Sequence, residues 1–173
     1  MITDLLTGDS GELFFGPGNL LDKDVIFVSI NYRLGVFGFL TLGDDSLPGN
    51  QGLWDQLGAL KWIKRNIAAF GGNPDKVTIF GESAGGWSVS YQLASHQSKD
   101  YFHAAIVQSG SLDMSMIHFG SPNDLPGLHQ KYVKQMECSI NTEDMSSTVK
   151  CLQDKTINEL VEKCHIFDEC NSM

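Results

Sequence analysis

A serine between small residues is the part of this sequence best suited to chemistry. Residues 81–85 read Gly-Glu-Ser-Ala-Gly, which places Ser83 two positions from a glycine on either side. A serine hydroxyl is a weak nucleophile, and it becomes reactive when a base removes its proton and nearby donors stabilise the resulting oxyanion. The pattern therefore predicts covalent catalysis through Ser83.

The neighbouring residues predict the turn that such a serine needs. Residues 77–80 are β-branched or aromatic and favour a strand, and residues 83–94 are compatible with a helix. A sharp strand-to-helix turn needs small flanking residues and tips its central side chain out of the edge of a sheet. The backbone N–H of Ala84 would then point toward the developing negative charge, helped by the helix dipole. The alternative is that Ser83 is an ordinary N-cap serine.

The rest of the first 110 residues alternates between strand and helix patterns. Residues 25–32 form a near-continuous apolar run, as in strands buried on both faces, and residues 104–107 predict another short strand. Apolar residues recur at three and four positions over 51–69, which predicts an amphipathic helix. The glycine-rich stretch 35–49 predicts a long loop. The order β-α-β-α-β predicts an α/β fold with helices on both faces of a parallel sheet.

The pattern changes after residue 111. Residues 112–126 predict a loop, and short amphipathic helices are predicted at 128–136, 145–153 and 156–164. We interpret residues 1–173 as a single α/β domain, in which about 112–173 form a helical portion resembling a lid or cap.

Composition excludes several classes of function. The formal net charge of -9 argues against nucleic-acid binding, which requires a basic face. No apolar run approaches the roughly 20 residues of a transmembrane helix, and the first residues do not resemble a signal peptide. Four cysteines allow three pairings, or could be separate buried thiols, and no CxxC spacing predicts a metal site: Cys138, Cys151, Cys164 and Cys170.

The segment around Ser83 resembles the active-serine signature of the type-B carboxylesterase family, which includes cholinesterases and the non-catalytic neuroligins. The resemblance rests on residues 70–85 (FGGNPDKVTIFGESAG) and continues in 31–40 (NYRLGVFGFL), 49–56 (GNQGLWDQ) and 108–111 (QSGS). It implies a partial α/β-hydrolase fold. It also implies hydrolysis of a small-molecule carboxylic ester through an acyl-enzyme, with no cofactor and no metal.

The resemblance also implies roles for three residues around the turn. Ser83 is similar to the nucleophile of the family, and Ala84 to the residue that supplies one oxyanion-hole N–H. Glu82 is similar to an acidic residue that lies in the active-site gorge of relatives.

Further positions match structural features of the family. Arg33 and Asp55 match an ion pair, although residue types alone would favour two independent surface charges. Cys138 and Cys151 match a disulfide, which suggests an oxidising compartment. The other two cysteines match nothing in the family.

The partners that such a serine needs are not evident. In α/β-hydrolases the acid and the histidine follow the serine, on loops after later strands. The five histidines after Ser83 do not occupy such positions: His96, His103, His118, His129 and His165. In the family a second oxyanion-hole donor comes from a loop that precedes the serine, and nothing before Val25 resembles that loop. We therefore expect an internal piece of a longer esterase with little activity alone; a non-catalytic adhesion or binding protein of the same family is the alternative.

Overall fold

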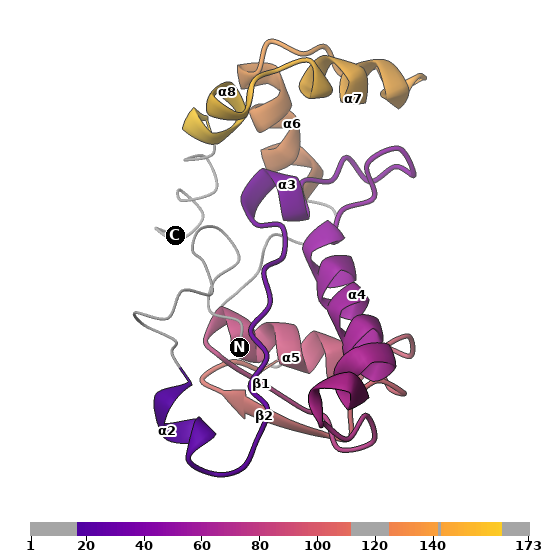
Figure 1. Cartoon of the computed structure of the whole chain (residues 1–173). Helices are drawn as coiled ribbons and strands as arrows, with labels where there is room; N and C mark the ends of the chain where they lie inside the picture. The colour runs from indigo at the N-terminus through magenta and orange to yellow at the C-terminus, as the bar shows by residue number, and fades with distance from the viewer. Residues whose placement is uncertain (1–16, 112–124, 142, 164–173) are drawn as a thin grey trace. The chain divides into compact units, whose positions relative to one another are not determined.

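The chain forms two compact units in a computed structural model that describes residues 17–111, 125–141 and 143–163 (Figure 1). Unit 1 contains residues 17–34 and 51–111, and unit 2 contains residues 35–50 together with the described residues from 125 onward. Each unit has its own set of buried side chains, so each is described by itself.

Unit 1 is built on two parallel strands. Strand β1 (Thr78–Glu82) pairs with β2 (Ala104–Gln108), with Thr78 opposite Ala104 and Glu82 opposite Gln108. Parallel neighbours require a crossover connection, and helix α5 (Ala84–Ala94) lies within it. The parallel arrangement confirms the α/β prediction (Figure 1).

The helices of unit 1 form successive layers over the two strands. Helix α5 packs against both strands, and helix α4 (Gln51–Asn66) packs against α5. Helix α4 continues into a 3₁₀ turn, η1 (Ile67–Phe70), which ends at Gly71 in the left-handed conformation with φ 84°. A short helix α2 (Gly18–Leu21) precedes these elements. The buried side of α4, η1 and α5 carries the apolar core of the unit: Leu57, Leu60, Ile63, Ile67 and Val89.

The predicted first strand does not form. Residues 25–32 form no strand, although the Phe27 ring lies 6.2 Å from that of Phe80 on β1. An apolar run expresses a preference for burial, whereas a strand also needs a hydrogen-bonded ladder with a neighbour. Val25 and Ile26 remain 48% and 44% exposed. Of the described helices, α5 makes the closest contacts with the two strands.

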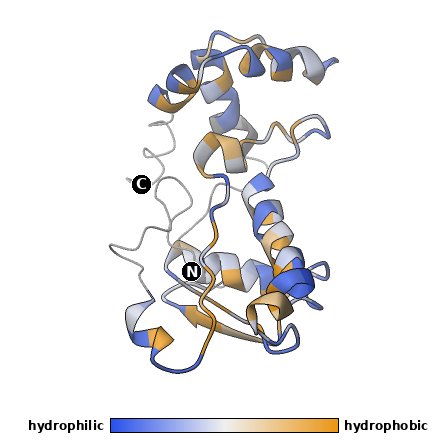
Figure 2. Ribbon diagram, in the orientation of Figure 1, coloured by the Kyte–Doolittle hydropathy of each residue, from blue (hydrophilic) through white to orange (hydrophobic). Residues whose placement is uncertain are grey.

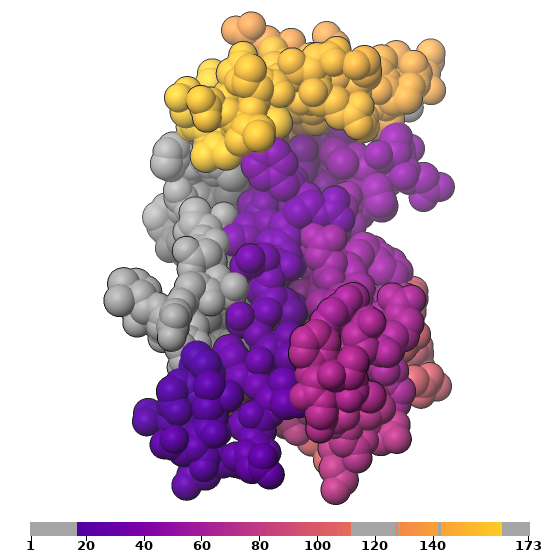
Figure 3. Space-filling view, viewed as in Figure 1, coloured from indigo at the N-terminus to yellow at the C-terminus, as the bar shows by residue number. Residues whose placement is uncertain are grey.

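Unit 2 is helical. It contains α3 (Gly35–Phe39), α6 (Leu125–Gln135), α7 (Met145–Gln153) and α8 (Ile157–Glu162), and α7 and α8 form a continuous surface in Figure 3 (yellow). The three C-terminal helices were predicted within three residues at each end. The buried core brings together residues of both segments of the unit: Val36, Leu40, Leu42, Tyr132, Val133, Met136, Cys138 and Leu152.

Helix α3 lies where a loop was predicted. Its two glycines disfavour a helix by about 1 kcal/mol each relative to alanine. Val36 of α3 and Leu40, the residue after α3, are nonetheless buried in one cluster with Tyr132 and Val133 of α6. Tertiary burial of these side chains therefore outweighs the local preference.

Two polar interactions define the ends of the C-terminal helices. Asp144 caps α7 by accepting a hydrogen bond from the Ser146 N–H, and Thr156 and Glu159 form a reciprocal capping box at α8. The Tyr132 hydroxyl donates to the Leu160 carbonyl over 2.8 Å and links α6 to α8. Within the described residues, no helix combines the length and apolarity needed to cross a membrane.

Candidate active site

Ser83 occupies the turn between β1 and α5. Its backbone has φ 53° and ψ -120°, a combination that is sterically unfavourable for any residue with a Cβ. The Ser83 N–H donates to the Gln108 carbonyl over 2.9 Å, and the Ser83 carbonyl accepts from the Trp87 N–H over 3.1 Å. The strained residue is therefore anchored to the end of β2 on one side and to the first turn of α5 on the other.

The glycines around Ser83 are required by close backbone contacts. A Cβ on Gly81 would lie 2.4 Å from the carbonyl carbon and oxygen of Gly85, and one on Gly86 would lie 2.6 Å from the Gln108 oxygen. A Cβ on Gly110 would lie 2.3 Å from the Ser83 oxygen. These separations are shorter than any non-bonded carbon contact, so the small residues of the motif have a steric cause.

The Ser83 hydroxyl is not used as a helix cap. Ser83 stands at the N-cap position of α5, but its side chain makes no capping hydrogen bond. The residue is also partly exposed. Among the described residues its hydroxyl has no recorded partner, which leaves it free to react and argues against the N-cap alternative.

The start of α5 presents unused backbone donors beside this hydroxyl. The first helical hydrogen bond runs from Trp87 to Ser83, so the N–H groups of Ala84, Gly85 and Gly86 precede the hydrogen-bonded turns. They lie at the positive end of the helix dipole. Such a helix start can stabilise negative charge on a group held next to Ser83.

The other candidate residues, Glu82 and the histidines, make no hydrogen bond to the Ser83 side chain within the described part of the chain. Glu82 is the last residue of β1 and is exposed. His96 and His103 are exposed in unit 1, and no described histidine hydrogen-bonds to Ser83. His118 and His165 lie outside the described residues. Within the described part of the chain, the candidate nucleophile and the candidate oxyanion donors thus lie together, and no described histidine hydrogen-bonds to Ser83.

Arg33 and Asp55 form the expected ion pair within unit 1. Arg33 Nε donates to Asp55 Oδ2 and Arg33 Nη2 donates to Asp55 Oδ1, each over 2.7 Å. The backbone N–H of Arg33 also donates to Oδ2, over 3.0 Å. The hydrogen bonds from Arg33 lower the pKa of Asp55, and the same contact raises the pKa of Arg33. The pair fastens residues 17–34 to α4, although the Arg33 side chain is half exposed.

A buried polar network behind the turn was not anticipated from the sequence. Gln56 Nε2 donates to Ser88 Oγ over 3.1 Å, and Gln92 Nε2 donates to Gln56 Oε1 over 3.3 Å and to the Leu53 carbonyl over 3.2 Å. These contacts join α4 to the helix that follows Ser83. The available signal was a glutamine at a core-facing position of an amphipathic helix.

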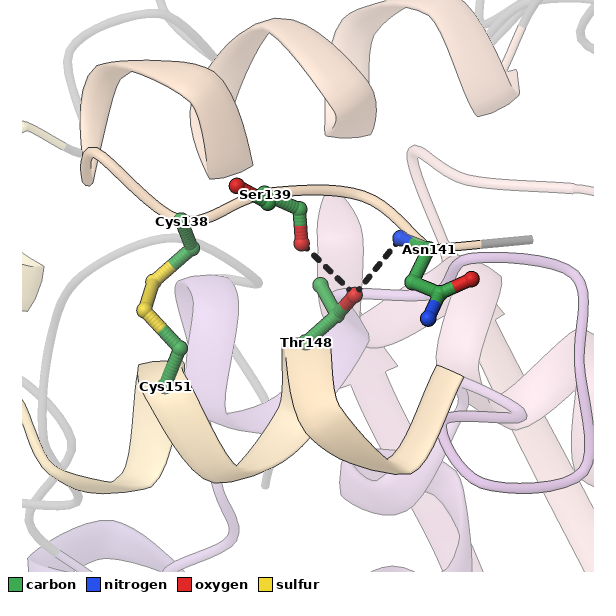
Figure 4. Close-up of a disulfide and its surroundings, with 5 residues drawn as sticks. All are labelled: Cys138, Ser139, Asn141, Thr148 and Cys151. Carbon is green, nitrogen blue, oxygen red and sulfur yellow. Dashed lines mark hydrogen bonds between the residues drawn. A yellow bond between two sulfur atoms is a disulfide. The ribbon is translucent and has the colours of Figure 1, made fainter. Parts of the chain in front are cut away.

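The expected disulfide forms in unit 2 (Figure 4). Cys138 and Cys151 are bonded with a Cα–Cα distance of 5.8 Å and a separation of 13 residues. Inside the loop that they close, the Thr148 hydroxyl donates to the Ser139 carbonyl over 2.8 Å and accepts from the Asn141 N–H over 3.2 Å. The remaining two cysteines lie outside the described residues.

Comparison with known proteins finds relatives that are similar over most of this chain. Mouse (Mus musculus) carboxylesterase 5A is 45% identical over 152 residues, which cover 88% of this chain and 26% of that protein. Esterase FE4 of Myzus persicae is 45% identical over 144 residues, covering 83% of this chain and 25% of that protein. Mouse neuroligin-2 is 41% identical over 162 residues, which cover 88% of this chain and 18% of that protein.

The chain thus spans about a quarter of the length of these two esterases. The family model described as "Carboxylesterase family" matches residues 3–172, which is nearly the whole sequence. The chain belongs to the carboxylesterase family.

Proposed function

We propose that this chain contributes the nucleophile to a serine-dependent carboxylic ester hydrolase. The observation that carries the proposal is the conformation of Ser83, a strained residue between β1 and α5 whose hydroxyl is free of capping contacts. A protein keeps such strain where the surrounding structure holds the residue for function. Membership of the carboxylesterase family supports ester hydrolysis as the reaction.

The proposed reaction is acyl transfer in two steps. The Ser83 oxygen attacks the ester carbonyl and loses its proton to a base, and the tetrahedral oxyanion accepts a hydrogen bond from the Ala84 N–H. The alcohol leaves with a proton, and an acyl-enzyme remains. Water then attacks the acyl group, releases the carboxylic acid and restores the hydroxyl. Glu82 is proposed to line the same site, because it precedes Ser83 at the end of β1.

We also propose that the 173-residue chain by itself hydrolyses esters at a rate near background. No described histidine hydrogen-bonds to Ser83, and an enzyme that lacks its base retains only a small part of its rate enhancement. A turnover assay with a short-chain aryl ester tests this expectation. A rate comparable to those of complete esterases would contradict it.

A chimera tests the nucleophile directly. The region of mouse carboxylesterase 5A that aligns with this chain is replaced by residues of this chain, so that the rest of the relative supplies the remaining parts of the site. We expect a fluorophosphonate probe to label Ser83 in the chimera and the Ser83→Ala variant to remain unlabelled. Ser95→Ala, at the other end of α5, is the control and should be labelled like the parent chimera.

The second candidate function is non-catalytic binding, and the similarity to neuroligin-2 is the observation that favours it. The resemblance of this chain to an active-serine signature argues against that role. A chimera that is folded, as judged by circular dichroism and cooperative melting, yet is not labelled at Ser83 would overturn the esterase proposal and leave the binding role.

A further inference from the structure

The outer face of α4 and η1 exposes three large aromatic side chains. Trp54, Trp62 and Phe70 are 50%, 46% and 64% exposed, and they recur every eight residues. Eight residues bring a helix back to within about 80° of the starting direction, so Trp54 and Trp62 share one side of α4. The rings of Trp62 and Phe70 lie 6.0 Å apart. We call this surface the α4 aromatic face; helix α4 is labelled in Figure 1.

Positive charge without an ion pair lies on the same segment of the chain as this face. Six charged residues lie between residues 51 and 76, and two are acidic: Asp55 pairs with Arg33, and Asp75 pairs with Lys64. The other three are basic and have no ion pair with a described residue: Lys61, whose ammonium lies 5.8 Å from the centre of the Tyr101 ring, Arg65 and Lys76. In Figure 2 the strongly hydrophilic end of α4 stands next to the apolar turn η1.

The charge of this segment is opposite to that of the rest of the chain. Residues 51–76 hold four basic and two acidic residues, a net charge of 4 − 2 = +2. The whole chain has a net charge of -9, so the remaining residues carry -9 − 2 = -11. A negatively charged surface would therefore attract this segment and repel the rest of the chain, which sets the orientation of approach.

We propose that the α4 aromatic face docks onto an anionic lipid surface. Tryptophan and phenylalanine beside lysine and arginine are the combination that enters the boundary between lipid headgroups and acyl chains. From Trp54 to Phe70 the face extends over about 24 Å at 1.5 Å per residue. A fluid lipid surface contacts side chains spread over that length without a matching shape, whereas an acidic protein would need a complementary surface.

The proposal does not depend on Ser83. Its groups lie on the outer side of α4 and on η1, whereas the polar network that supports the turn uses the inner side of α4 through Gln56. Docking and esterase chemistry can therefore be tested and rejected separately.

The test is flotation of the 173-residue chain with vesicles. We expect it to float with phosphatidylcholine vesicles that contain phosphatidylserine, and to dissociate at 1 M salt, where the Debye length is about 3 Å. Arg65→Gln should weaken the partition coefficient about fivefold, because each basic residue contributes roughly 1 kcal/mol near an anionic surface. Phe70→Ala should weaken it roughly tenfold by removing inserted apolar area.

Matched controls separate this face from general hydrophobic adhesion. Phe37→Ala removes a 40% exposed phenylalanine of α3, and Lys134→Gln removes an exposed lysine of α6; neither should change the partition coefficient. The proposal is overturned if the chain does not float, or if Phe37→Ala weakens flotation as much as Phe70→Ala. It is also overturned by salt-insensitive binding to phosphatidylcholine alone, or by binding to polyglutamate without binding to vesicles. Circular dichroism checks that each variant is folded.

Discussion

Ser83 is held in a backbone conformation that costs a residue with a Cβ about 1–3 kcal/mol. Two backbone hydrogen bonds, to Gln108 and from Trp87, keep it there. The strain places the hydroxyl at the start of α5 without using it as a cap. At the scale of a single residue, the structure therefore gives up stability to position one oxygen atom.

This strain predicts an unusual effect of glycine at position 83. Ser83→Gly should have a free energy of unfolding about 1 kcal/mol higher than Ser83→Ala, because glycine relieves more strain than its extra backbone entropy costs. Chemical denaturation of the two variants measures the difference. At Ser95, where φ is -79°, the order should reverse: Ser95→Gly should have a lower free energy of unfolding than Ser95→Ala. A Ser83→Gly variant less stable than Ser83→Ala would contradict the inference.

His129 is the second residue whose environment sets a measurable property. It is 4% exposed, and its Nδ1 lies 3.1 Å from the Thr41 nitrogen and 2.7 Å from the Thr41 oxygen. Burial lowers the pKa of His129, and the hydrogen bond with Thr41 opposes that shift only in part. The folded state therefore favours the neutral ring.

The lowered pKa of His129 predicts that unit 2 loses stability in acid. The unfolded chain binds a proton at a pH near 6.5, above the pKa of the folded form, so stability falls as the pH drops from about 6.5 through the folded pKa. Thermal unfolding between pH 7 and pH 5 measures this slope. His129→Asn should reduce this slope. An unchanged slope in His129→Asn would assign the pH dependence to other groups.

At the scale of elements, the contact between β1 and α5 depends on the absence of side chains. Gly81 faces the backbone of Gly85 so closely that no Cβ fits between them. Ser83 directly follows β1 in the chain, and its carbonyl accepts a hydrogen bond from the Trp87 N–H of α5. The glycines of the motif thus determine how the two elements meet.

Two glycine-to-alanine substitutions test this contact. Gly81→Ala should lower the free energy of unfolding by about 3 kcal/mol, as severe overpacking does. Gly58→Ala is the matched control, because a Cβ there meets nothing within 4 Å and alanine favours the α4 helix by about 1 kcal/mol. In urea denaturation, Gly81→Ala should therefore lower the free energy of unfolding and Gly58→Ala should raise it. A neutral Gly81→Ala would show that the turn can relax.

At the scale of the whole molecule, the two units contain separate spectroscopic signals. All three tryptophans lie in unit 1, and the disulfide between Cys138 and Cys151 lies in unit 2. A disulfide that closes a loop of this length stabilises by about 3 kcal/mol on the chain-entropy model. Its loss should therefore affect one unit.

The Cys138→Ser/Cys151→Ser double variant tests that separation. We expect helix loss, followed by far-ultraviolet circular dichroism, to begin at lower denaturant concentration than in the parent chain. The midpoint followed by tryptophan fluorescence should stay unchanged. Equal shifts in both signals would show that the two units unfold as one cooperative body.

The sequence by itself determined the parts that rest on local sterics and helix periodicity. The turn at Ser83, the helix α4 and the three C-terminal helices follow from residue types within a few positions of each other. The resemblance to the carboxylesterase family added the Arg33–Asp55 pair and the Cys138–Cys151 disulfide, which residue types alone left open.

Only the tertiary structure decided the features that need a partner distant in sequence. Residues 25–32 have the composition of a strand but no ladder, and α3 forms despite two glycines because Val36 is buried against α6. Gln56 is buried because Ser88 and Gln92, more than 30 residues away, satisfy its amide. The physical reason is common to all three: burial and hydrogen bonding belong to pairs of segments, and a local pattern describes only one member of each pair.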